Sequence, residues 1–276
     1  MISTLKHLAF TLKVELSELE YIINNIDDFY YEKKEIKLNN KGLPKLKNGI
    51  EQKRVLNPSI NRLKTIQKRI NKNILQTISI PDYAFGSIKG KTNILNAKKH
   101  QGKKYIFTTD LKNYFPSINN KRVFETFRSL NFSPLVSKHL TKLTTYKGRL
   151  PQGAATSSTL SNLAFIKIGE KLNQFAKENN LTFTTYIDDI TFSSPIDFKS
   201  KTEYIINILK DGGFKISHNK TTYKTKNPIV TGIKVHNNKI AISDAFKIKL
   251  VNTEGKSESQ IIGLKAYAQR IKDTNE

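Results

Sequence analysis

The chain has 276 residues, enough for one or two domains with a sizeable hydrophobic core. Its 47 lysine and arginine residues against 23 acidic residues give a net charge of +24, which indicates a polyanionic partner, either nucleic acid or an anionic membrane. No run of 18 apolar residues and no signal-peptide pattern is present, which excludes the membrane, and the absence of cysteine excludes disulfides and thiolate metal sites. We therefore expect a soluble, cytoplasmic protein that binds nucleic acid.

Two short amphipathic helical patterns fill residues 1 to about 26, and Ser17-Glu18-Leu19-Glu20 fits a capping box at the start of the second. Weak alternation over Phe29–Leu38 predicts a strand that leads into a β-ribbon. The next strand ends with Lys53-Arg54-Val55-Leu56-Asn57-Pro58, and Pro58 opens a helix with one apolar face. We therefore expect a helical extension, a basic ribbon and a helix, in that order.

Positive charge is concentrated between Lys53 and Lys104. This stretch has 13 lysine and arginine residues and one acid, Asp82, so half of the excess charge of the chain lies in less than a fifth of its length. Such a concentration is typical of a groove that follows a phosphate backbone. For Lys53 and Arg54 taken individually, a solvated basic face remains an alternative.

A glycine-containing loop and a polar pair follow in the same basic stretch. The glycines of Phe85-Gly86-Ser87-Ile88-Lys89-Gly90 permit a tight loop that approaches a ligand closely. Asn96 and His100 are four residues apart, so on a helix they would share one face and could both hydrogen-bond a partner. A structural role is the more common one for a lone His and Asn at this spacing.

Three aspartates indicate a metal site. The β-branched run Tyr105–Thr109 predicts a strand with Asp110 at its end, and Asp188-Asp189 lies between the strand patterns Thr182–Ile187 and Ile190–Ser194, so the pair should occupy a hairpin turn. Adjacent carboxylates repel each other unless a cation neutralises them. With Asp110 they could hold two Mg²⁺ ions for phosphoryl transfer. The alternative is that the pair forms an ordinary turn and Asp110 caps a helix.

The later elements alternate between helices and short strands. We expect the helices Asn120–Leu130 and Pro134–Thr145 to back the sheet that carries the aspartates. Leu150-Pro151-Gln152-Gly153 precedes small residues that begin a helix, where a base pair could press against the backbone and the N-terminus would favour phosphate. The remaining predictions are a helix at Phe198–Lys210 ended by Gly212-Gly213, a strand and loop at Phe214–Thr221, a hairpin over Ile229–Ile242, and a helix from about Ser257 to Lys272.

Three short motifs follow one another along the chain: Asp-Leu-x-x-x-Phe-x-Ser-Ile at 110–118, Leu-Pro-Gln-Gly at 150–153 and Tyr-Ile-Asp-Asp at 186–189. From about Lys53 to Ile242 the sequence resembles the reverse transcriptases, in which these are palm motifs A, B and C. Asn96-Ala97-x-x-His100 and Val230-Thr231-Gly232 are similar to two marks of the retron branch of bacterial reverse transcriptases. Two departures are Ile187, where retron enzymes usually have Ala, and a tail shorter than their usual helical thumb.

The resemblance implies an α+β, right-hand polymerase fold with an antiparallel palm sheet. It places a helical extension at 1–26, the fingers at 27–104, the palm at 105–225, and the palm end with a short helical thumb at 226–276.

The resemblance also implies roles for individual residues. Asp110 and Asp188 would bridge two Mg²⁺ ions with Asp189 in support, and Phe115, five residues after Asp110, would exclude a 2′-hydroxyl as a sugar gate unless it is a plain core residue. Lys220 would lie near the triphosphate and could protonate the departing pyrophosphate or attract it. The other implied nucleotide contacts are Lys53, Arg54, Gln152 and Gly153. The implied RNA-recognition residues are Asn96, His100, Val230, Thr231 and Gly232.

The implied function is RNA-directed DNA synthesis from dNTPs on a cognate structured non-coding RNA, with a branched RNA–DNA product (msDNA) and an effector protein in anti-phage defence. One alternative is another bacterial defence or group II intron-like reverse transcriptase without a branched product. A second is a non-catalytic RNA-binding protein on a polymerase fold, which the intact Asp110, Asp188, Asp189 and Gln152 disfavour. A third is a metal-dependent nuclease, which the Leu-Pro-Gln-Gly stretch does not support.

Overall fold

The computed structural model describes residues 2–39 and 43–276, and the chain forms two compact units. Unit 1 contains the segment that ends at Glu35, together with Lys53–Pro81 and Asn113–Lys167. Unit 2 contains the described part of Ile36–Gln52, together with Asp82–Lys112 and Ile168–Glu276. The units therefore alternate along the chain, and the division into consecutive fingers, palm and thumb segments stays a prediction.

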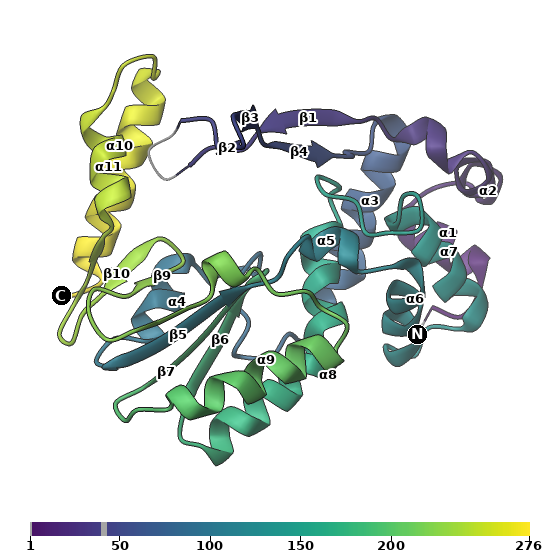
Figure 1. The fold of residues 1–276 in the computed structure, drawn as a ribbon. Helices are drawn as coiled ribbons and strands as arrows, with labels where there is room; N and C mark the ends of the chain where they lie inside the picture. Colours follow the sequence, from purple (N-terminus) through teal and green to yellow (C-terminus); the bar gives the residue numbers. More distant parts are fainter. Residues whose placement is uncertain (1, 40–42) are drawn as a thin grey trace. The chain divides into compact units, whose positions relative to one another are not determined.

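Unit 1 is mainly helical (Figure 1). Its elements are α1 (Leu5–Leu12), α2 (Leu16–Asn24), η1 (Ile26–Phe29), most of β1 (Lys33–Ile36) and its paired strand β4 (Lys53–Leu56), α3 (Asn61–Asn73), η2 (Leu75–Thr77), α5 (Tyr114–Ser117), α6 (Asn120–Ser129), α7 (Pro134–Thr144) and the first part of α8 (Ser157–Glu178). Leu12, Leu63 and Leu140 are fully buried between these helices, so their apolar stripes form one core.

Of two local predictions for unit 1, one stays a prediction and one is wrong. α7 packs against α1, α2, α3 and α6 within the helical unit, and backing of the sheet by the helices at 120–145 stays a prediction. No capping box forms at Ser17, because α2 begins at Leu16 after Glu15, which makes no side-chain cap. Glu18 instead accepts a hydrogen bond of 2.9 Å from the Arg62 guanidinium.

Unit 2 is built on a four-stranded antiparallel sheet with the order β6-β7-β5-β8. Its strands are β6 (Thr182–Tyr186), β7 (Asp189–Ser194), β5 (Tyr105–Asp110) and β8 (Thr222–Lys224). Helix α9 (Thr202–Asp211) lies along the C-terminal part of α8, where the rings of Phe175 and Tyr204 are 4.8 Å apart (Figure 1). The short helix α4 (Asn93–Lys99) contacts β6.

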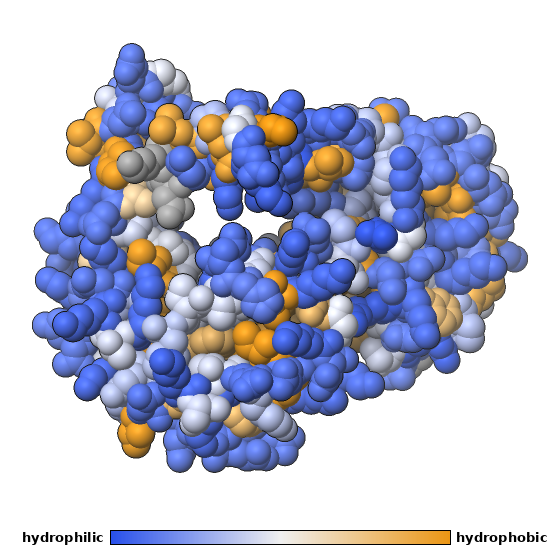
Figure 2. Space-filling view, viewed as in Figure 1, coloured by the Kyte–Doolittle hydropathy of each residue, from blue (hydrophilic) through white to orange (hydrophobic). Residues whose placement is uncertain are grey.

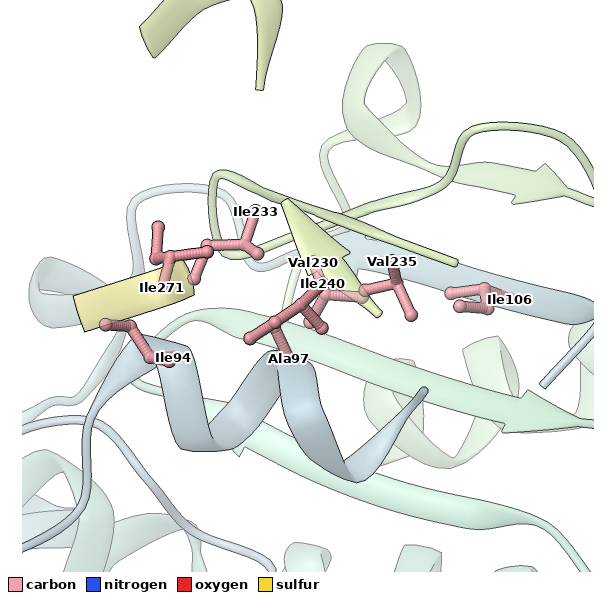
Figure 3. Close-up of a cluster of buried hydrophobic side chains, with 8 residues drawn as sticks. All are labelled: Ile94, Ala97, Ile106, Val230, Ile233, Val235, Ile240 and Ile271. Atoms are coloured by element: carbon pink, nitrogen blue, oxygen red, sulfur yellow. The ribbon is translucent and has the colours of Figure 1, made fainter. Parts of the chain in front are cut away.

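A second, three-stranded antiparallel sheet in unit 2 has the order β11-β10-β9. It comprises β9 (Ile229–Val230), β10 (Ile233–Val235) and β11 (Ile240–Ile242), followed by α10 (Asp244–Val251) and α11 (Glu258–Asp273). Figure 3 shows the apolar cluster that joins these strands to α4 and α11 through side chains such as Ile94, Val230 and Ile271. The predicted hairpin and the predicted last helix are thus confirmed, and Ser257 and Gln260 form a capping box on α11.

The other short elements of unit 2 are β2 (Leu46–Lys47), β3 (Ile50–Glu51), η3 (Lys199–Lys201) and η4 (His218–Lys220). None of the helices within 2–39 and 43–276 has both the length and the apolar character needed to cross a bilayer. Hydrophilic residues predominate on the face drawn in Figure 2, in keeping with the charged composition.

Candidate active site at the Asp188-Asp189 hairpin

Three aspartates meet at one end of the four-stranded sheet. Ile187 and Asp188 form the turn between β6 and β7, and Asp189 is the first residue of β7. Asp110 ends β5 directly opposite Asp189, and the Leu111 amide donates a 3.0 Å hydrogen bond to the Asp188 carbonyl. Residues paired across antiparallel strands have Cβ atoms about 5 Å apart, so the two carboxylates are neighbours. The predicted meeting of a strand end and a hairpin tip is confirmed.

The hairpin turn is braced by the segment Tyr83–Gly86. The Phe85 amide donates to the Thr185 carbonyl and the Thr185 amide donates to the Tyr83 carbonyl, each over 2.8 Å. A Cβ added at Gly86 would lie 2.7 Å from the Ile187 backbone nitrogen and 2.6 Å from its Cγ1. The loop therefore approaches the aspartate turn closely at Gly86, and its approach to a ligand stays a prediction.

Because the three aspartates are partly buried and carry like charges, binding of a cation to the cluster is favoured. Burial of Asp189 first, and then the charges of Asp188 and Asp110, raise its pKa to about 7, while Lys220 opposes the shift. A group with this pKa is partly protonated at neutral pH because its negative charge is poorly compensated. A bound cation would remove that penalty.

Lys220 and Ser217 hold the carboxylate of Asp110. The Lys220 ammonium donates to Asp110 Oδ2 and the Ser217 hydroxyl donates to Oδ1, each over 2.6 Å, while Asp110 is only 6% exposed. Burial alone would lower the pKa of Lys220, but its hydrogen bond to Asp110 and the charges of the three aspartates raise it. Lys220 was expected at this site from the family resemblance, whereas Ser217 was not, because a single serine carries no distinctive pattern.

The donor set suits a hard divalent cation, because Asp110, Asp188 and Asp189 supply carboxylate oxygens, the ligands that Mg²⁺ prefers. In the described parts of the chain, however, no group of three or more acidic, His or Cys side chains is already arranged to hold a metal ion. Both Asp110 oxygens have protein donors instead. The residues nevertheless fit the ion by the chemistry of their oxygens.

The other predicted nucleotide contacts, with the exception of Lys220, belong to unit 1. Lys53 and Arg54 are exposed on β4, and the Asn57 amide just after β4 donates a 2.8 Å hydrogen bond to the Gln152 carbonyl. Gly153 has φ +103°, and a Cβ there would lie 3.7 Å from both Leu56 and Pro58. The structure therefore places the Gln152-Gly153 loop beside the end of the basic strand.

Phe115 lies in α5, with its ring 5.7 Å from that of Tyr114. Phe115 is half-buried, whereas Tyr114 is buried and donates a hydrogen bond to the Ser161 carbonyl. These contacts leave Phe115 as the more accessible of the two rings.

Three of the predicted RNA contacts are buried in unit 2, and their role in RNA recognition stays a prediction. Asn96, His100 and Val230 are 1%, 0% and 0% exposed. They connect parts of unit 2: His100 at the end of α4 hydrogen-bonds Ser193 and Thr184 over 2.7 Å each. Burial, and to a lesser degree the charge of Lys103, lower the pKa of His100 to about 3, so it is neutral.

Thr231 and Gly232 form the turn between β9 and β10, with φ of +45° and +85°. Positive φ at both central residues is characteristic of a type I′ hairpin turn. Asn93 Nδ2 donates to the Thr231 carbonyl over 3.2 Å and to the Tyr267 hydroxyl over 2.6 Å. Gly232 remains exposed and Thr231 half-buried, so a role for this turn in RNA recognition stays a prediction.

Comparison with known proteins adds sequence relatives. The family model described as "Reverse transcriptase (RNA-dependent DNA polymerase)" matches residues 43–260. The chain is 34% identical to the Retron Se72 reverse transcriptase of Salmonella heidelberg (strain 579083-10), over 72% of this chain and 50% of that protein. It is 32% identical to the Retron Ec86 reverse transcriptase of Escherichia coli, over 71% of this chain and 63% of that protein. The chain thus spans about half to two thirds of the length of these relatives.

A solved structure supports the fold. Telomerase from Candida albicans, in complex with a TWJ fragment of telomeric RNA, matches with a TM-score of 0.52 at 13% identity and covers 79% of this chain and 48% of that chain. At this identity the similarity concerns the fold alone, and it agrees with the α+β polymerase fold expected from the sequence.

Proposed function

The chain belongs to the reverse transcriptase family, and from this premise we propose that it is an RNA-directed DNA polymerase that uses dNTPs and two Mg²⁺ ions. The observation that carries the proposal is the pairing of Asp110 with Asp189 across β5 and β7, beside the Asp188 turn. This pairing brings the aspartates of two separate sequence motifs to one end of a sheet.

In the proposed reaction, Asp110 and Asp188 hold the divalent cations and Asp189 supports them. When bound, such ions activate an attacking hydroxyl and stabilise the leaving oxygen of a phosphoryl transfer. Lys53, Arg54 and Lys220 neutralise the triphosphate, Phe115 excludes a ribose 2′-hydroxyl, and Gln152-Gly153 contact the new base pair. Ser217 fixes the orientation of the Asp110 carboxylate through its 2.6 Å hydrogen bond.

Replacing both hairpin aspartates tests this proposal. We expect Asp188→Asn with Asp189→Asn to abolish extension of an RNA-templated DNA primer, since neutral amides do not hold the cations, and to leave RNA affinity unchanged within about twofold. Primer extension and an RNA-binding titration measure the two effects. Asp211→Asn, an exposed change at the end of α9, serves as the matched control. Wild-type extension by the double variant would refute the role of the cluster.

We further propose that the enzyme copies a cognate non-coding RNA in the cytoplasm, beginning at an RNA 2′-hydroxyl, and acts with an effector protein in anti-phage defence. The similarity to retron reverse transcriptases supports this narrower function. The protein should be purified after expression with its native flanking locus, and the bound nucleic acid treated with RNase. A discrete short DNA with a 2′–5′-linked RNA stub is the expected result. Extension of an added primer-template without such a DNA would instead indicate a reverse transcriptase of another kind.

A further inference from the structure

Each oxygen of the Asp110 carboxylate accepts a hydrogen bond from a neighbouring side chain. Lys220 Nζ lies 2.6 Å from Oδ2, and Ser217 Oγ lies 2.6 Å from Oδ1. A cation bound through Asp110 needs at least one of these two oxygens. At Oδ2 a divalent cation would compete directly with the Lys220 ammonium.

The backbone around Lys220 fixes this contact. The Ser217 amide donates to the Asp110 carbonyl and the Lys220 amide donates to the Ser217 carbonyl, each over 2.8 Å. The hydroxyls of Thr221 and Thr109 are also 2.8 Å apart. These bonds attach η4 to the end of β5 and bring the root of the Lys220 side chain next to Asp110.

The two partners differ in how easily they can move. The Asp110 side chain is 8% exposed, whereas that of Lys220 is 55% exposed. The lysine can therefore swing into solvent around its flexible stem, while the carboxylate stays in place on β5. Its single charge faces three aspartates, so it neutralises the cluster less completely than a divalent ion would.

We propose that Lys220 is an internal counter-cation that occupies Asp110 in the metal-free enzyme and leaves it when a divalent cation binds. The freed ammonium then turns to the triphosphate, so that occupancy of the metal site determines which of two partners Lys220 contacts. The contact of Lys220 with the triphosphate rests on the proposed function, whereas its contact with Asp110 rests on the observed structure alone.

Binding of Mn²⁺ to the full chain without nucleotide tests the competition. We expect Lys220→Met to bind Mn²⁺ roughly threefold to tenfold more tightly than the wild type, because no ammonium must be displaced. Lys215→Met removes the same charge from an exposed position of the same segment and should have a markedly smaller effect. Lys220→Arg, which keeps the charge, should not tighten binding. Equal affinities of Lys220→Met and Lys215→Met would overturn the proposal.

Labelling of the unaltered protein gives a second measurement. With an acetylating reagent and mass spectrometry, Lys220 should react several-fold faster after addition of Mg²⁺, while Lys215 should not change. An unchanged Lys220 rate at saturating Mg²⁺ would contradict the displacement. If Lys220→Met binds Mn²⁺ more tightly and Mg²⁺ speeds acetylation of Lys220, but no primer is extended, Lys220 does compete with the cation and the proposed polymerase function fails. If primers are extended and neither of these two changes is seen, the polymerase function stands and the competition between Lys220 and the cation is wrong.

Discussion

Ile187 has φ +58°, in the left-handed region that β-branched residues rarely adopt. Such a conformation costs of order 1–3 kcal/mol and persists only where its surroundings enforce it. Gly86 supplies part of that enforcement, because its missing side chain lets the loop lie against the Ile187 backbone. Ile187, which replaces the alanine usual in retron enzymes, thus packs in the space left by the missing side chain of Gly86.

We expect Gly86→Ala to displace the aspartate turn. Its Cβ would lie 2.6–2.9 Å from three atoms of Ile187, and overpacking of this kind costs roughly 1–3 kcal/mol of stability. A shift of the carboxylates by about 1 Å could lower the rate of DNA synthesis on the order of 100-fold. Primer extension and thermal unfolding measure the two effects. Gly263→Ala, where a Cβ meets nothing within 4 Å, is the control and should leave extension unchanged.

His100 should make the stability of the protein depend on pH. Its pKa is lowered to about 3 in the folded state, against a reference value of 6.5, so the unfolded chain binds a proton more readily. This stabilising contribution is complete above about pH 6.5 and is lost as pH falls towards 3, at up to about 1.4 kcal/mol per pH unit.

Denaturant unfolding between pH 7 and 5 measures this slope for the wild type and for His100→Gln, which cannot take up the proton. We expect the variant to be less stable at pH 7 and to lose less stability on acidification. His139→Gln, on helix α7, should keep the wild-type slope. An unchanged slope in His100→Gln would mean that His100 does not titrate on unfolding.

Helix α4 connects the four-stranded and the three-stranded sheets of unit 2. His100 at its C-terminal end binds β6 and β7 through Thr184 and Ser193. Asn93 at its start binds the turn between β9 and β10 and Tyr267 of α11. Helix α4 therefore joins the aspartate-bearing sheet to the last helix, through His100 at one end and Asn93 at the other.

The last helix should detach when these contacts are weakened. Ile271 of α11 is 2% exposed in the shared apolar cluster, and Ile271→Ala should destabilise the docked helix by about 2–4 kcal/mol. Tyr267→Phe removes the hydroxyl that Asn93 binds and should cost about 1 kcal/mol. Hydrogen exchange of the α11 amides measures both. Ile262→Ala, at a 59% exposed position of the same helix, should leave exchange close to that of the wild type.

The net charge of +24 should make RNA binding strongly dependent on salt. For single-stranded nucleic acid, the logarithm of affinity falls with the logarithm of salt concentration with a slope of about −0.7 for each neutralised phosphate. If Lys53 and Arg54 each contact a phosphate, Lys53→Gln with Arg54→Gln should reduce the magnitude of this slope by about 1.4. Binding titrations from 50 to 300 mM salt, on the order of physiological values, measure it.

Lys138→Gln with Lys142→Gln is the matched control for that pair. It removes two exposed charges from α7 in the same unit. The control should weaken binding only slightly and leave the slope unchanged. Equal slopes for the two double variants would show that Lys53 and Arg54 act only through the overall charge.

The local elements and the members of the aspartate cluster could be predicted from the amino-acid sequence alone. The strand ending at Asp110, the turn at Asp188 and the helix after Ser257 follow from alternation, turn propensity and capping, which depend on residues close together in the chain. The order of the three motifs at 110–118, 150–153 and 186–189 also indicated the protein family and, through it, the fold. Local patterns were nevertheless ambiguous at Ser17, where a capping pattern fell inside a helix that had already begun.

Contacts between segments that are distant in the sequence could be read only from the three-dimensional structure. It paired Asp110 with Lys220, set Gly86 against Ile187 and buried His100 between two strands, although nothing adjacent in sequence marks these contacts. It also assigned the helices at 120–145 to unit 1, because an apolar stripe shows that a helix is covered but not by which partner. Packing between remote segments depends on the complementary shapes of whole surfaces, and that information is absent from any local stretch of sequence.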